Sequence, residues 1–138
     1  MLEIKDSVAV ITGGASGIGL VMAQYWAKRG GKVVIGDINE EALKSASEVI
    51  DGETKTVLCN VTDENTCTAL ADVAIEAFGQ INFVAPFAGI IMDGLMISTD
   101  RNTGKVTKKM PLEQFQKVVD INLTGVFLTV RELSLIHI

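Results

Sequence analysis

The stretch VAVITGGASGIG, residues 8–19, joins an apolar, β-branched run to three spaced glycines and then to a helical pattern. Gly13 permits a sharp turn, while Gly17 and Gly19 carry no Cβ and let the backbone and the helix N-terminus approach a pyrophosphate. Small residues also allow a helix to pack closely on a strand, but the position between strand and helix favours a dinucleotide-binding turn.

Strand-like and helix-like segments alternate along the chain. Apolar, β-branched runs bounded by Gly, Asp or Asn predict four buried parallel strands at Val8–Ile11, Lys32–Ile35, Thr56–Cys59 and Asn82–Ala85. Between these runs, apolar residues recur at helical spacing, which predicts crossover helices. The alternation predicts an α/β fold, with a doubly wound parallel sheet of about four strands and helices on both faces.

Each expected helix presents an apolar face. The face of the first helix, which ends at Gly30 and Gly31, consists of Ile18, Val21, Met22, Tyr25 and Trp26. The second and third faces consist of Ala42, Leu43, Ala46, Val49 and Ile50, and of Cys67, Leu70, Ala71, Ala74, Ile75 and Phe78. A fourth helix begins near Pro111, and its stripe consists of Phe115, Val118, Val119, Val126 and Val130.

Asn122 falls on the stripe of the fourth helix, so we expect this side chain to point inward. An amide that is buried without partners costs about 1–3 kcal/mol, and Asn122 therefore requires hydrogen bonds or ordered water. Periodicity alone leaves two interpretations open, a satisfied core asparagine and a functional group.

Composition argues against several classes of protein. The 138 residues carry a net charge of −5, and the basic pair Lys108–Lys109 is too small for a nucleic-acid interface. No apolar run approaches the roughly 20 residues of a membrane helix, and the N-terminus lacks a signal-peptide pattern, so we expect a cytoplasmic protein. Cys59 and Cys67 show no metal-ligand or redox spacing, so we expect two reduced core residues and no metal site.

Asp37 ends the second strand, about 20 residues after the glycines. A carboxylate at this position accepts hydrogen bonds from both ribose hydroxyls of an adenosine, which favours NAD. The 2′-phosphate of NADP would meet the like charge of Asp37, and neither Ile38 nor Ser16 supplies a compensating cation. In the alternative interpretation Asp37 only caps the following helix, and the two roles are compatible.

Four motifs in order resemble those of the short-chain dehydrogenase/reductase family: TGGASGIG at 12–19, CNVTDE at 59–64, FAGI at 87–90 and DINLTGVF at 120–127. The resemblance extends from Ser7 to about Glu132. It implies a Rossmann fold and an NAD(P)-dependent oxidoreductase that transfers hydride between the nicotinamide and an alcohol or ketone. It also implies a homodimer or homotetramer that pairs through the fourth helix, where Phe127 and Val130 face the partner subunit.

The same resemblance implies roles for individual residues. The pyrophosphate and the adjacent ribose are held by Gly13, Ser16, Gly17, Ile18 and Gly19, and the adenosine ribose by Asp37 and Ile38. Asn60 and Val61 contact the adenine, while Ala88 and Gly89 form the small surface on which the cofactor rests. Asn122 distorts its helix and holds a water molecule of a proton relay.

The chain departs from the family pattern in two motifs. Asn60 replaces the usual Asp against the adenine, and its amide oxygen still accepts a hydrogen bond from the exocyclic amine. Pro86 and Phe87 replace both asparagines of the NNAG motif, so the hydrogen bonds that brace the sheet must come from elsewhere. Neither departure excludes cofactor binding.

The segment between Gly89 and Met110 is longer than a typical connection, which favours a functional role. Its central part, ISTDRNTGKVT at 97–107, predicts a small hairpin that borders the substrate site. Met92, Leu95 and Met96 either line an apolar pocket or pack on the domain.

The resemblance implies a catalytic tyrosine, a lysine four residues later and a serine, none of which is found in a matching position. Tyr25 lies in the first helix and is followed by Arg29, and Ser134 comes too early in the chain. The chain is then either the N-terminal part of a dehydrogenase, inactive by itself, or a non-catalytic, redox-sensing module. A nucleotide-sugar epimerase is a third class. The incomplete sheet favours the first interpretation.

The C-terminal residues LSLIHI resemble the translation of a transposon mosaic end that sequencing adapters contain. We therefore expect residues 1–132 to be the N-terminal part of a single NAD-binding domain, and residues 133–138 to be a non-native, adapter-derived tail. His137 then has no functional meaning.

Overall fold

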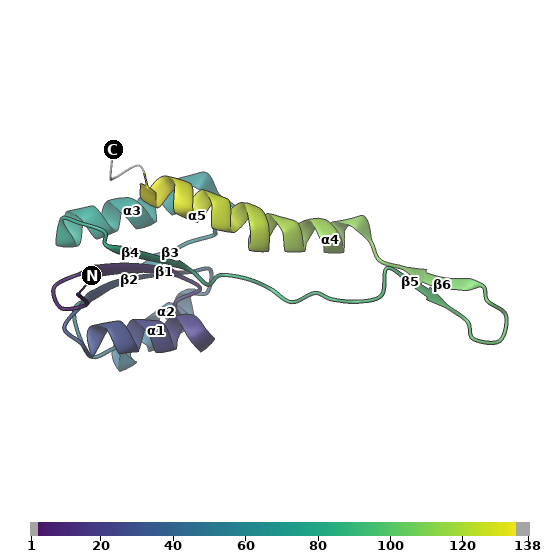
Figure 1. Ribbon diagram of the computed structural model, residues 1–138, viewed down its shortest axis with the longest axis horizontal. Coiled ribbons are helices and arrows are strands. Elements are labelled where there is room, and N and C mark those ends of the chain that lie inside the picture. Colours follow the sequence, from purple (N-terminus) through teal and green to yellow (C-terminus); the bar gives the residue numbers. More distant parts are fainter. Residues whose placement is uncertain (1–2, 135–138) are drawn as a thin grey trace.

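The computed structural model describes residues 3–134 and has a parallel sheet between two layers of helices (Figure 1). The sheet consists of β1 (Val8–Thr12), β2 (Lys32–Asp37), β3 (Thr54–Leu58) and β4 (Phe83–Pro86), in the order β3-β2-β1-β4. One face is covered by α1 (Gly17–Ala27) and α2 (Glu40–Val49), the other by α3 (Glu64–Phe78) and α5 (Gly125–Ser134). The predicted α/β fold with a doubly wound sheet is confirmed, with strand ends shifted by up to two residues.

Two apolar cores lie on opposite faces of the sheet. Ala9 and Ile11 of β1 point into the core beneath α1 and α2, while Val10 points into the core beneath α3 and α5. All five residues of β1 are buried, as expected of a strand with a neighbour on each side and helices above and below. Cys59 and Cys67 are buried free thiols of the second core, as predicted.

The face predicted for α1 is wrong in part. Trp26 is buried, but Ile18, Val21 and Tyr25 are exposed, and Ile18 is 73% accessible. Small residues, Gly19, Ala23 and Ala27, lie against the sheet in their place. A Cβ at Gly19 would lie 2.1 Å from the carbonyl oxygen of Gly13, so the close packing requires glycine there. Large apolar residues mark the buried face poorly when a helix is apolar on every side.

The buried faces predicted for α2 and α3 are confirmed for the central residues of each helix, which are Leu43, Ala46, Leu70 and Ala74. Both helices begin at side-chain caps: Asn39 Oδ1 accepts from Ala42 N–H (3.0 Å), and Asp63 Oδ1 accepts from Asn65 N–H (2.9 Å). In α2, however, Val49 is exposed.

The fourth helix is interrupted in its middle. It consists of α4 (Leu112–Val119), the π-helical turn η1 (Asp120–Thr124) and α5. A π turn inserts an extra residue and rotates everything that follows, so a stripe counted on a regular helix does not continue across it. Val130, which follows the turn, is exposed, and so is Phe115 in α4. The inward position predicted for Asn122 is also wrong, because this side chain is exposed.

The predicted hairpin is present as β5 (Ile97–Thr99) and β6 (Val106–Lys109), an antiparallel pair. Its turn is held by Asp100 Oδ1, which accepts from Asn102 N–H (2.9 Å) and Thr103 N–H (2.7 Å). These hydrogen bonds lower the pKa of Asp100. The hairpin projects from the body of the molecule at the end of an extended connection (Figure 1).

At the C-terminal end of the described chain, Leu133 is buried in the second core and Ser134 ends α5. The rest of the expected tail, with His137, lies outside the described residues, so its adapter origin stays a prediction. Within residues 3–134, no helix combines the length and apolar character needed to cross a membrane.

Candidate functional site

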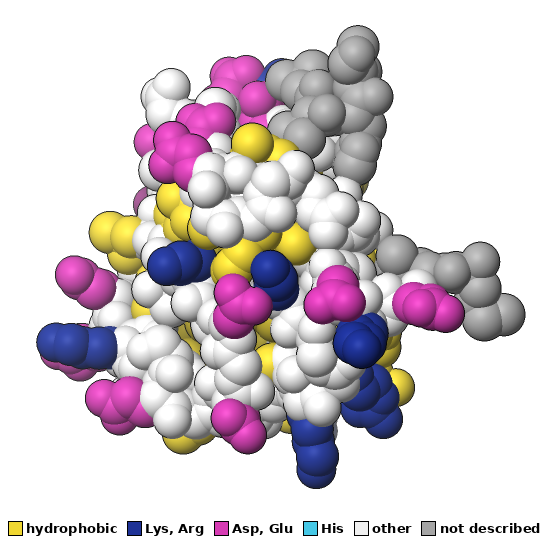
Figure 2. Space-filling model, turned by 90° about the vertical axis from the view of Figure 1, so that its left-hand side faces the viewer, with side chains coloured by type: hydrophobic (Ala, Val, Ile, Leu, Met, Phe, Trp, Pro, Cys, Tyr) yellow, Lys and Arg dark blue, Asp and Glu magenta, His cyan; other side chains and the backbone are white. Residues whose placement is uncertain are grey.

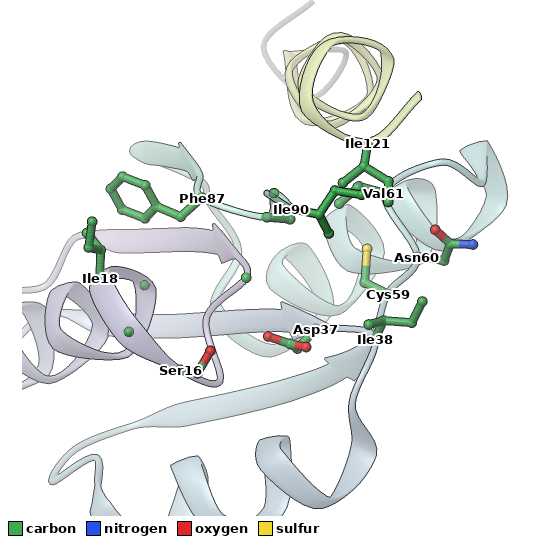
Figure 3. Close-up of a pocket in the computed structure, with 15 residues that line it drawn as sticks. Ser16, Ile18, Asp37, Ile38, Cys59, Asn60, Val61, Phe87, Ile90 and Ile121 are labelled. Carbon is green, nitrogen blue, oxygen red and sulfur yellow. The ribbon is translucent and has the colours of Figure 1, made fainter. Parts of the chain in front are cut away.

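A cavity of about 370 Å³ lies at the carboxyl ends of the parallel strands (Figure 3). The order β3-β2-β1-β4 reverses direction between β1 and β4, and ligands bind at such a switch point in open α/β sheets. The cavity is lined by Gly13, Ser16, Gly17, Ile18, Gly19, Asp37, Ile38, Cys59, Asn60, Val61, Phe87, Ala88, Gly89, Ile90 and Ile121. Every residue predicted to bind the cofactor is among them.

The glycine turn is fixed by close contacts on one side and open on the other. Gly13 has φ +65°, and a Cβ there would lie 2.7 Å from Ala88 N, in collision with backbone. Gly17 has φ +51°, but a Cβ there would meet nothing within 4 Å. The turn therefore presents bare backbone to the cavity at Gly17, where a ligand can approach closely.

The N-terminus of α1 offers unused hydrogen-bond donors. The first intrahelical bond runs from Leu20 N–H to Ser16 O (3.1 Å), so the amides of Gly17, Ile18 and Gly19 precede it. Ser16 occupies the N-cap position, yet its exposed hydroxyl makes no capping bond. These donors, together with the positive end of the helix dipole, suit a phosphate group.

Asp37 is held in place by two backbone amides. Its Oδ2 accepts from Ala15 N–H (3.2 Å) and its Oδ1 from Asn39 N–H (3.1 Å). The capping alternative is not supported, because Asn39 is the N-cap of α2. Each carboxylate oxygen retains a lone pair, so Asp37 can still accept from a ribose hydroxyl.

The far wall of the cavity differs in one detail from the sequence-based expectation. Asn60 Oδ1 already accepts from the Thr62 N–H (3.1 Å) and from the Thr62 hydroxyl (2.8 Å). Its predicted acceptance from an adenine amine would require one of these bonds to break, which leaves the Nδ2 group as the free polar group. Ile38 is exposed beside it and Val61 is buried.

Asn122 lies beside the cavity and not in its lining. Its Oδ1 accepts from Ile90 N–H (2.9 Å), and its Nδ2 donates to Ile90 O (2.8 Å). The amide is therefore satisfied by the backbone that follows β4, as its chemistry requires. The π-helical turn that contains Asn122 gives the helix distortion that the family resemblance implied.

Pro86 has a visible consequence for Thr12. These two residues face each other across β1 and β4, and Thr12 Oγ1 is a buried hydroxyl without a hydrogen-bond partner among the described residues. Proline offers neither an N–H nor a polar side chain. The bracing bonds expected of an asparagine at position 86 are therefore not replaced at Thr12.

Four lining residues were not predicted: Cys59, Phe87, Ile90 and Ile121. Each is next in sequence to a residue that was predicted. They could not be predicted because the sequence does not show which side chains of these segments point into the cavity. In Figure 3, Ile18 and Phe87 lie at one end of the cavity, and Ile38 and Asn60 at the other. Met92, Leu95 and Met96 are exposed and do not line this cavity, and no residue of the hairpin lines it. The predicted position of the hairpin beside a substrate site stays a prediction.

The remaining reactive groups are remote or protonated. Burial raises the pKa of both thiols, that of Cys67 to about 12, so neither is a thiolate near neutral pH. Tyr25 lies on α1 outside the cavity lining, with the Arg29 guanidinium 3.4 Å from its ring centroid. Residues 3–134 contain no group of three His, Cys, Asp or Glu side chains suited to a metal ion.

A family model for short chain dehydrogenases matches residues 7–136, and the chain belongs to this family. It is 35% identical over 132 residues to the 2,5-dichloro-2,5-cyclohexadiene-1,4-diol dehydrogenase LinX of Sphingobium indicum, covering 94% of this chain and 48% of LinX. It is 30% identical over 129 residues to the 3-oxoacyl-[acyl-carrier-protein] reductase FabG of Thermotoga maritima, and the match covers 91% of this chain and 48% of FabG.

Solved structures give the same result. A 3-ketoacyl-(acyl-carrier-protein) reductase from Brucella melitensis complexed with NADH aligns with a TM-score of 0.78 at 29% identity, covering 94% of this chain and 50% of that one. NAD+-bound xylitol dehydrogenase aligns with a TM-score of 0.78 at 26% identity, and the match covers 96% of this chain and 48% of the xylitol dehydrogenase. The chain thus spans about half the length of the relatives it matches, and like them it has a Rossmann fold.

Proposed function

We propose that this chain is the cofactor-binding part of an NAD-dependent dehydrogenase that acts on an alcohol or ketone. The observation that carries the proposal is the single cavity surface that joins the open glycine turn, the free amides of α1 and the anchored carboxylate of Asp37. Membership in an oxidoreductase family and the NADH and NAD+ complexes of structural relatives support it. Residues 1–132 then form part of one domain in a longer enzyme.

The cavity suggests the direction in which a dinucleotide would lie. Asp37, Ile38 and Asn60 surround the end suited to adenosine, and the amides of Gly17 to Gly19 suit the pyrophosphate. Ile18 and Phe87 flank the opposite end with apolar surface that excludes water from a nicotinamide. When bound, the nicotinamide supplies or accepts the hydride. This chain binds and orients that ring, while the proton donor or acceptor belongs to the part of the enzyme that these residues do not contain.

The charge of Asp37 is the reason for proposing NAD and not NADP. We expect the protein to bind NAD more tightly, and Asp37→Ala to lower NAD affinity by about tenfold while NADP affinity stays equal or rises, since the repelling charge is gone. Isothermal titration calorimetry with each cofactor measures both constants. Asp51→Ala, an exposed carboxylate beyond α2, is the matched control and should change neither. An unaltered preference in Asp37→Ala would refute this assignment.

A non-catalytic, redox-sensing module is the second candidate, since the described residues provide no histidine, lysine, tyrosine or carboxyl side chain at the cavity apart from Asp37. Both candidates predict cofactor binding and no turnover by the 138-residue chain. They differ in the longer protein: the dehydrogenase oxidises alcohols with NAD, measured as absorbance of NADH, whereas the sensor binds NAD without turnover. Turnover by the 138-residue chain alone would contradict both.

The outer face of α4 and α5 supports the expected association of subunits. Phe127 and Val130 are 59% and 44% exposed, and Leu112, Phe115 and Leu123 are exposed along the same helix. Large apolar residues exposed together on one element are typical of a subunit interface. We propose a homodimer in which two copies of this side, here called the α4–α5 stripe, pack together.

A further inference from the structure

The β5–β6 hairpin, residues 97–109, forms an arm that makes no core of its own. Both strands are exposed apart from Ser98, and the arm projects beyond the sheet and its helices (Figure 1). A two-stranded hairpin is at best marginally stable in water unless a further surface packs against it. The arm therefore lacks the covering that its strands require.

One side of the arm is suited to bind another surface. Ile97 pairs with Lys109 and Thr99 with Val106, which places these four side chains on one face of the ribbon. Ile97 is 56% exposed and Val106 is 51% exposed. This face combines β-branched apolar groups with a cation at its edge.

The charge of the arm is opposite to that of the rest of the chain. It contains four of the chain's 12 basic residues, Arg101, Lys105, Lys108 and Lys109, and one of its 17 acidic residues. That residue, Asp100, is engaged by the amides of the turn. A basic arm on an acidic molecule is complementary to the acidic surface of a second copy.

The acidic surface that fits is α3, which contains Glu64, Asp72 and Glu76 and no Lys or Arg. Asp72 and Glu76 are exposed, while Glu64 pairs with Arg131 of α5. At the end of the molecule that faces away from the arm, acidic side chains are exposed near the top of Figure 2, in the α3 and α5 layer, and also over the rest of that face. An arm cannot reach α3 of its own chain, because the two lie at opposite ends (Figure 1).

We propose that the arm binds the second copy of this chain: in the dimer formed by the α4–α5 stripe, each basic arm lies against the acidic α3 of its partner. This inference rests on the proposed dimer. Leu112–Ser134 is about 34 Å long, and antiparallel packing of two such helices brings the base of one arm beside the far end of the other helix, where α3 lies. Parallel packing would instead place two basic arms together, at a cost in repulsion.

Charge reversal tests the contact. We expect Lys108→Glu/Lys109→Glu to raise the dimer dissociation constant about tenfold or more, and the addition of Asp72→Lys/Glu76→Lys to restore it in part. Sedimentation equilibrium measures the constant, and thermal unfolding at matched concentration checks the fold of each variant. Glu40→Lys/Glu41→Lys on α2 is the control and should not restore dimerisation. A dimer unaffected by the arm substitutions, or no restoration, would overturn the proposal.

The stripe is tested separately. Phe127→Asp should abolish the dimer whatever the arm does; if it does so while the arm variant dimerises normally, the dimer stands and the arm contact fails. A wild-type chain that is monomeric at about 100 µM would overturn both. As a direct test, oxidised Lys109→Cys/Glu76→Cys should run as a disulfide-linked dimer on a non-reducing gel, and each single variant as a monomer. Absence of that dimer under oxidation contradicts the arm contact.

Discussion

At the scale of the residue, Thr12 shows how the proline at position 86 affects the neighbouring strand. Its Oγ1 is buried and unpaired within residues 3–134, opposite Pro86. A buried hydroxyl without a partner destabilises, so replacing it with a methyl group of the same shape should not harm the fold. We expect Thr12→Val to leave the free energy of unfolding unchanged or raise it by about 1 kcal/mol in urea titrations.

Thr129 is the matched control, because it is equally buried but its hydroxyl donates to Gly125 O (2.8 Å). Thr129→Val should lower the free energy of unfolding by about 1 kcal/mol, the usual contribution of one hydrogen bond. A loss in Thr12→Val as large as in Thr129→Val would show that Thr12 has a partner after all.

Single residues with an obligatory role could be predicted from the sequence. Gly13 and Asp37 could be identified because a sharp turn between strand and helix and a carboxylate at the end of the second strand each admit few residue types, and the positive φ of Gly13 and the bond from Ala15 N–H to Asp37 agree with both. The engagement of Asn60 Oδ1 by Thr62 was missed, because it depends on the local turn and not on residue type. Likewise Phe87 is conspicuous in the sequence, but only the backbone shows that its ring flanks the cavity.

At the scale of the element, Asn122 connects the π-helical turn to the segment after β4 through its two bonds to Ile90. We expect Asn122→Ala to release this segment, so the Ile90 amide should exchange with deuterium faster, and to cost about 1–2 kcal/mol of stability. Hydrogen exchange followed by NMR measures both effects.

Gln114→Ala provides the control for this prediction. Gln114 Nε2 donates to Met92 O (2.8 Å), two residues further along the same segment. Its loss should loosen the chain at Met92 and leave the protection of the Ile90 amide unchanged. Equal exchange of Ile90 in wild type and Asn122→Ala would contradict the anchoring role.

Periodicity predicted the helices that lie between strands better than the helix that ends the described chain. Leu70 and Ala74 of α3 are buried as expected because a regular helix keeps its phase over its whole length. In the fourth helix, η1 changes the phase, and no propensity argument locates a π turn. Helix α1 packs so close to the sheet that only small residues fit between them. Gly19 and Ala23 are therefore buried, and Ile18 is exposed.

At the scale of the whole molecule, the doubly wound sheet with helices on both faces could be predicted because parallel strands with short crossovers admit few arrangements. The two cores follow from that arrangement, whereas the exposed stripe and arm do not. A stripe that faces a second copy has the same periodicity as one that faces its own sheet. Only the structure distinguishes the apolar residues that are buried within the chain, such as Leu133, from those left exposed, such as Phe127.

The buried thiol of Cys67 makes the stability of the whole molecule depend on pH. Burial raises its pKa from 9.0 to about 12, so the folded state holds this proton more tightly than the unfolded state does. Its stabilising contribution is complete below pH 9 and is lost as the pH rises from 9 towards 12, because only the unfolded thiol ionises. The free energy of unfolding should fall over this interval.

Cys67→Ala removes this contribution, while every other ionisable side chain is present in both proteins. Below pH 9 the variant should be less stable than wild type, since the shorter side chain leaves a small cavity in the second core. That difference in stability should narrow as the pH is raised from 9 to 11, since only wild type loses the contribution of the buried proton. Urea titrations of both proteins at pH 8, 9, 10 and 11 measure it, and a constant difference would mean that the folded thiol ionises as readily as the unfolded one.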